Sequence, residues 1–270
     1  MIRVDDPDDP RIEHYRAVRD RDIAGRVGRF VAEGDVVVRA LLGPGSRFRP
    51  ESLLLSKSRA PALSPLIERL PPDIPVFVAD GHVMDAIVGF HIHRGVLAIG
   101  LRGPDPDIDV LLAGLPARAT VLGLVGLSNH DNVGGAFRNA AAFGASAVVL
   151  DGGSCDPLYR KATRVSVGAS LLVPFARART PSDLVGALAG SGFTSFALSP
   201  SGSTPLERVA WPSRTALLAG AEGAGLPNEI LARVQGVRIG MAEGFDSLNV
   251  ATASAVALHA LRTSAGPVAD

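Results

Sequence analysis

The sequence contains little cysteine and little lysine, and its charges cancel. Cys155 is the single cysteine among 270 residues, so an intrachain disulfide framework and a CxxC or Cys/His metal spacing are excluded. Lysine occurs only at positions 57 and 161, and the other formal cations are arginines, which suit bidentate contacts with phosphate. The alternative explanation is the base composition of the genome, which produces the same preference for arginine over lysine. With 27 cationic and 27 acidic residues, the whole chain has no net attraction to nucleic acid or to a membrane surface.

Long apolar runs are also missing. The N-terminus has no apolar segment of the kind that a secretory signal contains, and no stretch is long and apolar enough to span a bilayer. The single cysteine agrees with a reducing compartment. The sequence therefore predicts a soluble, cytoplasmic protein without a membrane segment.

What the sequence does contain is an alternation of short apolar runs with helical patterns, typical of α/β folds. Hydrophobic residues make up 47% of the chain, enough for one large domain or two smaller ones. The first ten residues are acidic and contain proline, and we expect them to be frayed. The segment 103–109, with two prolines and three aspartates, predicts a linker. We therefore expect two α/β domains, 1–105 and 106–270.

The alternation predicts a set of elements in each half. Apolar runs in the second half are short and bounded by turn residues, as buried parallel strands are. Helices are predicted at 35–42 and 61–70, and strands at 29–34, 52–56, 74–80, 95–102, 119–127, 146–151, 170–175, 193–198, 215–220 and 236–241.

Three polar loops in the second half are candidates for a site. In an open α/β sheet, ligands bind beyond the carboxyl ends of the strands, where such loops begin. In the first loop, 127–145, Asn132 precedes Gly134 and Gly135 in the first turn of a helix. Glycine is costly there unless something approaches the backbone closely. Arg138 points either toward this loop or into solvent.

The second loop, 217–230, has its glycines in the order G-x-x-G-x-G. This order differs from the G-x-G-x-x-G of a dinucleotide fold, which disfavours a nucleotide-dependent oxidoreductase. Glu222 lies in this loop directly after an apolar run. It is either a solvated turn residue or a carboxylate of the site.

The third loop begins GFDSLN at residue 244 and continues as a helix with Ala, Val and Leu at helical spacing. One N-cap side chain satisfies the first amides of a helix, yet Asp246, Ser247 and Asn249 all stand at its start. Either two of the three are ordinary capping and turn residues, or the start of the helix holds a ligand.

In this order, the three loops resemble the sequence motifs of the SpoU-type (TrmH-like) RNA ribose 2'-O-methyltransferases, within the SPOUT class of knotted methyltransferases. The matching segments are DNVGGAFRNAAAFGA, GAEGAGLP and IGMAEGFDSLNVATASAVAL, and the likeness covers about residues 119–262. It implies methyl transfer from S-adenosylmethionine to a ribose 2'-hydroxyl of a structured RNA, with ribosomal RNA somewhat favoured over transfer RNA. No metal is implied.

The resemblance also implies an architecture. The second domain is expected to be a parallel-sheet domain tied in a trefoil knot and paired in a homodimer. The N-terminal part is similar to the smaller L30e-like α/β domain that many members carry for binding the RNA substrate.

Residue roles follow from the resemblance, position by position. The third motif usually begins Ile-Pro-Met, and here Gly240 replaces the proline and Ala242, Glu243 and Gly244 follow, where a shorter or less charged turn is common. The resemblance implies catalytic roles for Asn132, Arg138, Glu222, Ser247 and Asn249, and cofactor contacts for Gly220, Glu222, Gly223, Ile239, Met241, Ser247 and Leu248.

Positive charge is concentrated in two short segments. Residues 36–69 contain six cationic side chains against two acidic ones, which indicates either an RNA surface or an ordinary solvated face. Phe48, between two arginines, is placed to stack an unpaired base. The predicted RNA contacts are Arg39, Arg47, Arg49, Lys57, Arg59, Arg160, Lys161 and Arg164.

Other reactive residues are given ordinary roles. His91 and His93 alternate along an expected strand, but no carboxylate or cysteine accompanies them at ligand spacing, so no metal site is predicted. Cys155 is interpreted as a small side chain at a turn, and His130 as a loop residue. The alternative function is a catalytically silent RNA-binding relative of the same fold, against which the intact motif residues argue.

Overall fold

The computed structural model describes residues 1–16, 28–88 and 95–264 of the chain. It divides into two compact units, one formed by Met1–Pro104 with Leu158–Leu172 and the other by Asp105–Pro157 with Val173–Asp270. The first division falls where the sequence predicts a linker. Nothing in the sequence pattern predicts that Leu158–Leu172 groups with the first unit.

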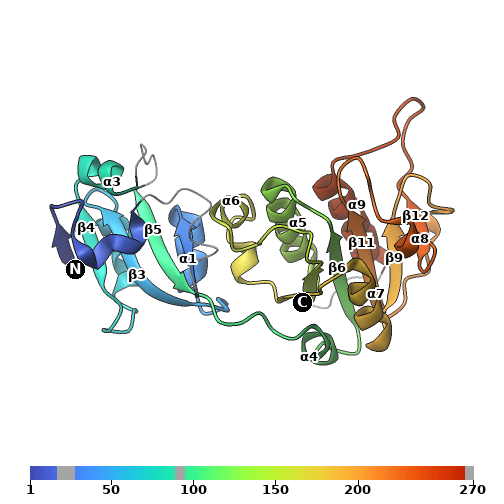
Figure 1. The fold of residues 1–270 in the computed structure, drawn as a ribbon, viewed down its shortest axis with the longest axis horizontal. Coiled ribbons are helices and arrows are strands. Elements are labelled where there is room, and N and C mark those ends of the chain that lie inside the picture. The colour runs from blue at the N-terminus through green and yellow to red at the C-terminus, as the bar shows by residue number, and fades with distance from the viewer. Residues whose placement is uncertain (17–27, 89–94, 265–270) are drawn as a thin grey trace. The chain divides into compact units, whose positions relative to one another are not determined.

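The first unit contains a five-stranded mixed sheet in the order β1-β4-β3-β5-β2 (Figure 1). β1 and β3 are parallel to β4, whereas β5 is antiparallel to both β3 and β2. The strands are β1 (Ile2–Val4), β2 (Arg29–Glu33), β3 (Arg49–Ser56), β4 (Val76–Ala79) and β5 (Val96–Leu101), and the helices are η1 (Pro10–Tyr15), α1 (Asp35–Leu42), α2 (Ala60–Ile67), α3 (Gly81–Val88), α6 (Arg160–Val165) and η2 (Ala169–Leu171).

The prediction that the first ten residues are frayed is wrong. Ile2–Val4 pairs with β4 as an edge strand, and the Val4 side chain is buried in a core that also contains Ile12 and Tyr15. The acidic residues that suggested fraying follow the strand, where Asp9 caps η1 by accepting a hydrogen bond from the Arg11 amide.

The second unit is built on a seven-stranded sheet in the order β10-β12-β9-β11-β6-β7-β8, and every pair in it is parallel. The strands are β6 (Ala119–Val125), β7 (Ala147–Leu150), β8 (Phe175–Arg177), β9 (Thr194–Leu198), β10 (Thr204–Pro205), β11 (Arg214–Gly220) and β12 (Gln235–Arg238), and the helices are α4 (Ile108–Ala113), α5 (His130–Phe143), α7 (Pro181–Gly190), η3 (Leu206–Arg208), α8 (Asn228–Leu231) and α9 (Val250–Ser264).

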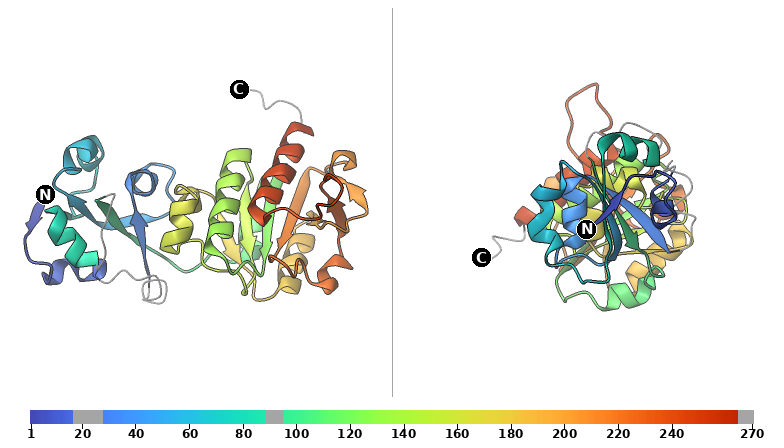
Figure 2. Two further views of the ribbon diagram at one scale, coloured as in Figure 1. Left: turned by 90° about the horizontal axis from the view of Figure 1, so that it is seen from above. Right: turned by 90° about the vertical axis from the view of Figure 1, so that its left-hand side faces the viewer.

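Both faces of this sheet are covered. Val121 and Val125 of β6 belong to one core cluster with residues of α4, α7 and α8, and the alternate residue Leu122 is also fully buried. This burial on both faces explains the continuous apolar runs of the sequence. Figure 2 shows α5 and α9 lying side by side against the sheet.

The sheet order reverses beside β6. After β6 the chain builds β7 and β8 on one side, then crosses over, and β11 fills the place between β9 and β6. The last residues of β11 and β6, Gly220 and Val125, are direct partners. Ligands of open α/β sheets bind at such a reversal, beyond the carboxyl ends of the strands.

Two strand predictions need correction. The run predicted as a strand at 170–175 instead forms the 3-10 turn η2 after Gly168, whose φ is 82°, and β8 begins only at Phe175. The strand predicted at 236–241 ends at Arg238. At the first place buried apolar residues lie outside a strand, and at the second Ile239 and Met241 lie half-buried outside one, so hydrophobicity alone gave the wrong assignment.

No helix in the described ranges is long and apolar enough to cross a membrane.

Candidate functional site

Three polar side chains from separate loops meet at the carboxyl edge of the second sheet. Asn132 lies in the first turn of α5, Glu222 follows β11, and Asn249 precedes α9. The Asn249 Nδ2 atom donates to Asn132 Oδ1 at 2.9 Å and to Glu222 Oε1 at 3.1 Å. The structure therefore brings together three of the five residues to which the sequence assigns catalytic roles.

Asn249 is at the same time the N-cap of α9. Its Oδ1 accepts hydrogen bonds from the amides of Ala251 at 2.9 Å and Thr252 at 3.3 Å. Because the helix amides require the oxygen, the amide nitrogen must face Asn132 and Glu222. The cap thus fixes the orientation of a side-chain amide that would otherwise be free to rotate. Capping and site formation are properties of one residue.

This arrangement leaves one donor and one acceptor available at the site. Asn132 is 5% exposed and uses its Oδ1 toward Asn249, so its Nδ2 remains a donor. Glu222 uses Oε1, and its second oxygen remains an acceptor. Within the described parts of the chain, no hydrogen bond occupies either atom. A hydroxyl group placed here would find both a donor and an acceptor.

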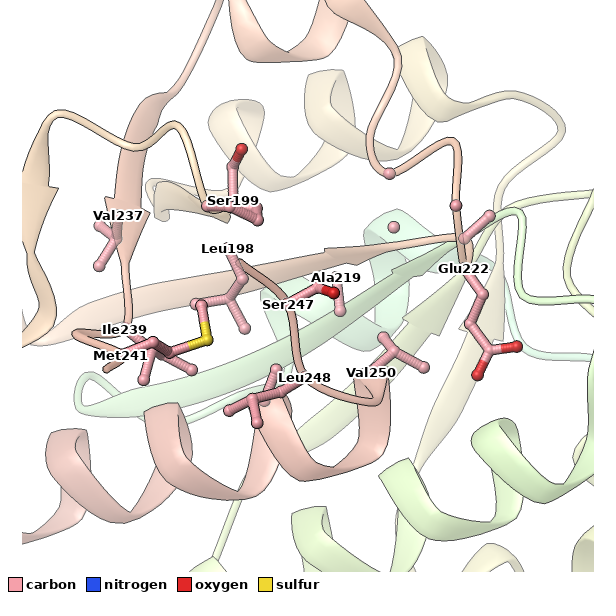
Figure 3. Close-up of a pocket in the computed structure, with 16 residues that line it drawn as sticks. Leu198, Ser199, Ala219, Glu222, Val237, Ile239, Met241, Ser247, Leu248 and Val250 are labelled. Atoms are coloured by element: carbon pink, nitrogen blue, oxygen red, sulfur yellow. The ribbon is translucent and has the colours of Figure 1, made fainter. Parts of the chain in front are cut away.

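A pocket opens beside these side chains. Together with the open solvent at its mouth, it takes in about 780 Å³. Figure 3 shows Leu198, Ile239, Met241 and Leu248 gathered at one end and the Glu222 carboxylate at the other. The lining also includes Ser199, Pro200, Ala219, Gly220, Ala221, Gly223, Gly225, Val237, Ser247, Val250 and Ala253.

All seven positions to which the sequence assigns cofactor contacts line this pocket: Gly220, Glu222, Gly223, Ile239, Met241, Ser247 and Leu248. They come from two segments of the sequence, 220–223 at the end of β11 and 239–248 before α9. Their side chains and backbone make a mostly apolar wall with a few polar groups, which is the usual lining of a cofactor site.

The turn after β11 is shaped by its glycines. The backbone folds back so tightly that Ala221 and Gly225 form an isolated bridge, with the Gly225 amide donating to the Ala221 carbonyl at 2.9 Å. A Cβ atom at Gly220 would lie 2.3 Å from the Gly225 carbonyl carbon. Gly223 and Gly225 have φ values of 81° and 68°, which glycine adopts without strain.

Comparisons with known proteins agree with this geometry. Residues 119–259 match the SpoU rRNA Methylase family. This chain belongs to that family. An uncharacterized tRNA/rRNA methyltransferase of Mycobacterium bovis is 43% identical over 97% of this chain and 92% of its own length. The chain is therefore an RNA methyltransferase of the SpoU family.

Solved structures of similar fold cover both units of the chain. The AdoMet-bound rRNA methyltransferase from Sinorhizobium meliloti has a TM-score of 0.80 and 25% identity, with 97% of each chain covered. An RNA 2'-O ribose methyltransferase has a TM-score of 0.79 and 24% identity, covering 98% of this chain and 100% of the other. The predicted α/β fold with a parallel sheet is confirmed.

The other two catalytic predictions of this SpoU chain lie apart from the bonded trio. Arg138 is exposed on α5, and within the described residues it forms no hydrogen bond or ion pair. Ser247 is exposed in the loop before α9, lines the pocket, and donates from Oγ to Asp246 Oδ1 at 3.2 Å. Both are accessible to a bound substrate.

Several lining residues were missed by sequence reasoning. Leu198 ends β9, Ser199 follows it, and Ala253 lies in the first turn of α9. The position of Leu198 and Ser199 at the carboxyl end of a buried strand was the only available signal for them. Ala253 lies within the third motif, but nothing in the sequence distinguished it from the other small residues of that helix.

Most of the predicted RNA contacts of the first unit already have partners. Arg39 pairs with Asp35 at 2.7 Å, and Arg49 pairs with Asp73. Lys57 and Arg59 are exposed, and no ion pair within the described residues holds either of them. The Arg47 guanidinium lies 5.8 Å from the centroid of the Phe48 ring.

Phe48 is itself held by the protein. Its ring is half-buried and packs edge-on against Phe30, with centroids 5.1 Å apart. One side of the ring is therefore used within the first unit, which limits the stacking that the sequence suggested.

The basic group on α6 is matched by one buried carboxylate. Glu33 is 6% exposed and lies 3.2 Å from an Arg160 nitrogen and 3.3 Å from an Arg164 nitrogen. Lys161 is half-buried on the same helix. Two of the three charges therefore fasten α6 to β2.

The remaining reactive residues occupy ordinary positions. Burial raises the pKa of the Cys155 thiol to about 11, and its amide donates to the Leu127 carbonyl at a turn. His130 begins α5, whereas His91 and His93 lie outside the described residues. Within the described ranges, no group of three His, Cys, Asp or Glu side chains is arranged to hold a metal.

Proposed function

We propose that this chain transfers a methyl group from S-adenosylmethionine to a ribose 2'-hydroxyl of a structured RNA, with ribosomal RNA favoured over transfer RNA. The observation that carries the proposal is the free Asn132 donor and Glu222 acceptor, held by Asn249 beside a mostly apolar pocket.

The residues of the pocket fit S-adenosylmethionine. Leu198, Val237 and Ile239 provide the apolar wall that an adenine ring needs, and the glycines of the β11 turn leave backbone uncovered for polar contacts. The bound cofactor supplies an electrophilic methyl group on a sulfonium. The predicted cofactor contacts, including Met241, Ser247 and Leu248, are proposed to hold it.

The chain's own residues then have to orient a hydroxyl and remove its proton. Glu222 accepts the proton through its free oxygen, and the Asn132 amide donates to the 2' oxygen. Asn249 holds both partners and is itself fixed by its capping bonds. Positioning a nucleophile correctly supplies about 7–11 kcal/mol toward a barrier of this kind. Ser247 borders the same space from the pocket side.

Arg138 is proposed to clamp the phosphate beside the target ribose. An arginine side chain stays protonated in proteins, so it stabilises negative charge rather than acting as a base. Arg138→Lys keeps the charge but loses the bidentate fork, and we expect a clear loss of turnover with unchanged cofactor affinity. Near wild-type turnover in this variant would rule out the clamp.

Substrate binding is assigned to the first unit, as an L30e-like RNA-binding domain. Lys57 and Arg59 are the best supported contacts because they are exposed and lack carboxylate partners among the described residues. Phosphate contacts release counterions, so RNA affinity should fall steeply with salt. A homodimer of knotted second domains is part of the same proposal.

The test is transfer by the purified protein. The protein is incubated with S-adenosylmethionine carrying a deuterated methyl group and with unmodified ribosomal or transfer RNA, and the RNA is digested to nucleosides for mass spectrometry. We expect the label on the ribose of ribosomal RNA nucleosides. Cofactor binding by calorimetry without any transfer to either RNA would instead indicate a silent RNA-binding relative.

A further inference from the structure

Three residues on one face of α5 contact the first turn of α9. Asn132, Gly135 and Asn139 are spaced three and four residues apart, which places them on one side of a helix. Asn132 bonds to Asn249. A Cβ atom at Gly135 would lie 2.8 Å from the Ala251 Cβ, so the absence of a side chain there allows the two helices to approach closely.

Asn139 completes this contact. Its Nδ2 donates to the Ala251 carbonyl at 2.6 Å and lies 3.4 Å from Ser254 Oγ. The Ala251 amide, in turn, donates to Asn249 Oδ1 at 2.9 Å. One residue of the first turn is therefore fixed at both its amide and its carbonyl, by the cap on one side and by Asn139 on the other.

The same turn contributes to the site in two ways. Asn249 projects from its start toward Asn132 and Glu222, while Val250 and Ala253 line the pocket. Asn139 itself does not line the pocket and forms no bond with the three site residues. Its side-chain hydrogen bonds go to Ala251 and Ser254, so it can act on the reaction through the position of α9.

We propose that Asn139 is a positioning residue, which sets the start of α9 so that Asn249 and the pocket wall are aligned at once. This inference deepens the proposed methyl transfer and depends on it for the kinetic readout. A displacement of the turn by about 1 Å is enough to cost up to about 10²-fold in rate. The loss expected from removing Asn139 is therefore kinetic as well as structural.

A purely structural role is the competing explanation, and the opposite end of the same helix pair provides its control. There, His259 of α9 packs edge-on against Phe143 of α5, with ring centroids 5.7 Å apart. His259→Ala removes a contact between α5 and α9 without touching the first turn. It should lower thermal stability while leaving cofactor affinity and turnover within about twofold of wild type.

The experiment compares Asn139→Ala with His259→Ala at a temperature where both are folded, as checked by circular dichroism. For Asn139→Ala we expect the calorimetric Kd for S-adenosylmethionine to rise about tenfold, kcat to fall at least about tenfold, and RNA affinity to stay unchanged. Asn139→Asp, of equal size, sets a carboxylate oxygen against the Ala251 carbonyl and should lose as much or more. Asn139→Asp replaces Asn139→Ala in the comparison if Asn139→Ala does not fold.

A double-variant comparison separates positioning from stability. If Asn139 acts through the turn that carries Asn249, then adding Asn139→Ala to Asn249→Ala should reduce kcat less than about twofold further. The proposal would be overturned if the losses of kcat in the two single variants multiplied in the double variant. It would also be overturned if the folded Asn139 variants kept wild-type cofactor affinity and turnover. Failure of the wild-type protein to transfer methyl would instead refute the proposed function, and the calorimetric comparison would still decide the role of Asn139.

Discussion

Gly220→Ala is expected to damage the site through the backbone alone. Gly220 ends β11 at the centre of the pocket, and a Cβ atom there would lie 2.3 Å from the Gly225 carbonyl carbon, 2.4 Å from the Leu226 nitrogen and 2.5 Å from the Gly225 oxygen. All three are backbone atoms of the returning arm of the turn. None of them can move aside by changing a rotamer.

The size of the effect follows from these distances. Carbon atoms rest at about 3.5–4.0 Å, so the returning arm must move by about 1 Å or more. Overpacking of this kind costs about 1–3 kcal/mol of folding free energy. The turn between Gly220 and Gly225 also carries Glu222 and Gly223, which line the pocket. A misplacement of about 1 Å in a site costs up to about 10²-fold.

The assay is titration calorimetry with S-adenosylmethionine on the folded variant, followed by transfer kinetics. We expect Gly220→Ala to weaken cofactor binding at least about tenfold and to lower kcat/KM about 10²-fold. Gly186→Ala, in α7 and outside the pocket lining, is the matched control, because nothing lies within 4 Å of its Cβ position and its φ is not positive. Wild-type cofactor affinity in a folded Gly220→Ala protein would show that the turn does not shape the binding site.

Three further outcomes are expected. Asn249→Asp keeps the capping oxygen but replaces the donor facing Glu222 with a carboxylate oxygen, so turnover should fall about 10²-fold while the thermal midpoint changes little; preserved turnover would contradict the donor role. Glu33→Gln leaves two arginines of α6 without a carboxylate. Urea unfolding should show a decrease in the free energy of unfolding toward the low end of about 3–5 kcal/mol, because Arg164 is 37% exposed. An unchanged midpoint would mean that the ion pairs add no stability. The pKa of Cys155 is raised from 9.0 to about 11, so its contribution to stability is complete below pH 9 and is lost as the pH rises through 11. At pH 8, iodoacetamide should therefore label the native thiol far more slowly than the unfolded one. Equal labelling rates would refute the burial of the thiol.

The parallel sheet was predictable because each strand of the second unit is a short apolar run ended by turn residues. Such a run is typical of a strand buried on both faces, as Ala119–Val125 and Arg214–Gly220 are. The same signal failed at 170–175, where Leu171 is buried in a 3-10 turn and Pro174 precedes the true strand. An apolar run indicates that a segment is buried, but it does not show that the segment is a strand.

The candidate site was predictable as a set of loops but not as a set of contacts. Asn132 and Asn249 are separated by 117 residues, and their hydrogen bond forms where α9 packs beside α5. The sequence indicates that polar residues follow strands, but it does not give the order of the strands. For the same reason the double role of Asn249, as cap and as site residue, stayed an open alternative until the structure joined both functions.

Charge was the least reliable signal. The basic segment 36–69 suggested a continuous RNA surface, yet Arg49 pairs with Asp73, which lies 24 residues further along the chain. Arg160 similarly pairs with Glu33, on a strand more than a hundred residues earlier. A count of charges in a window cannot include partners that the fold brings in from outside it. No such partner reaches Lys57 or Arg59 among the described residues, and their contact with RNA stays a prediction.

A crystal structure of the protein with S-adenosylmethionine would test the arrangement most directly. We expect the cofactor between the wall of Leu198 and Ile239 and the Gly220 turn, with its methyl group directed to the space beside Asn132 and Glu222. Cofactor density elsewhere in the molecule, or a methyl group directed away from these two side chains, would contradict it.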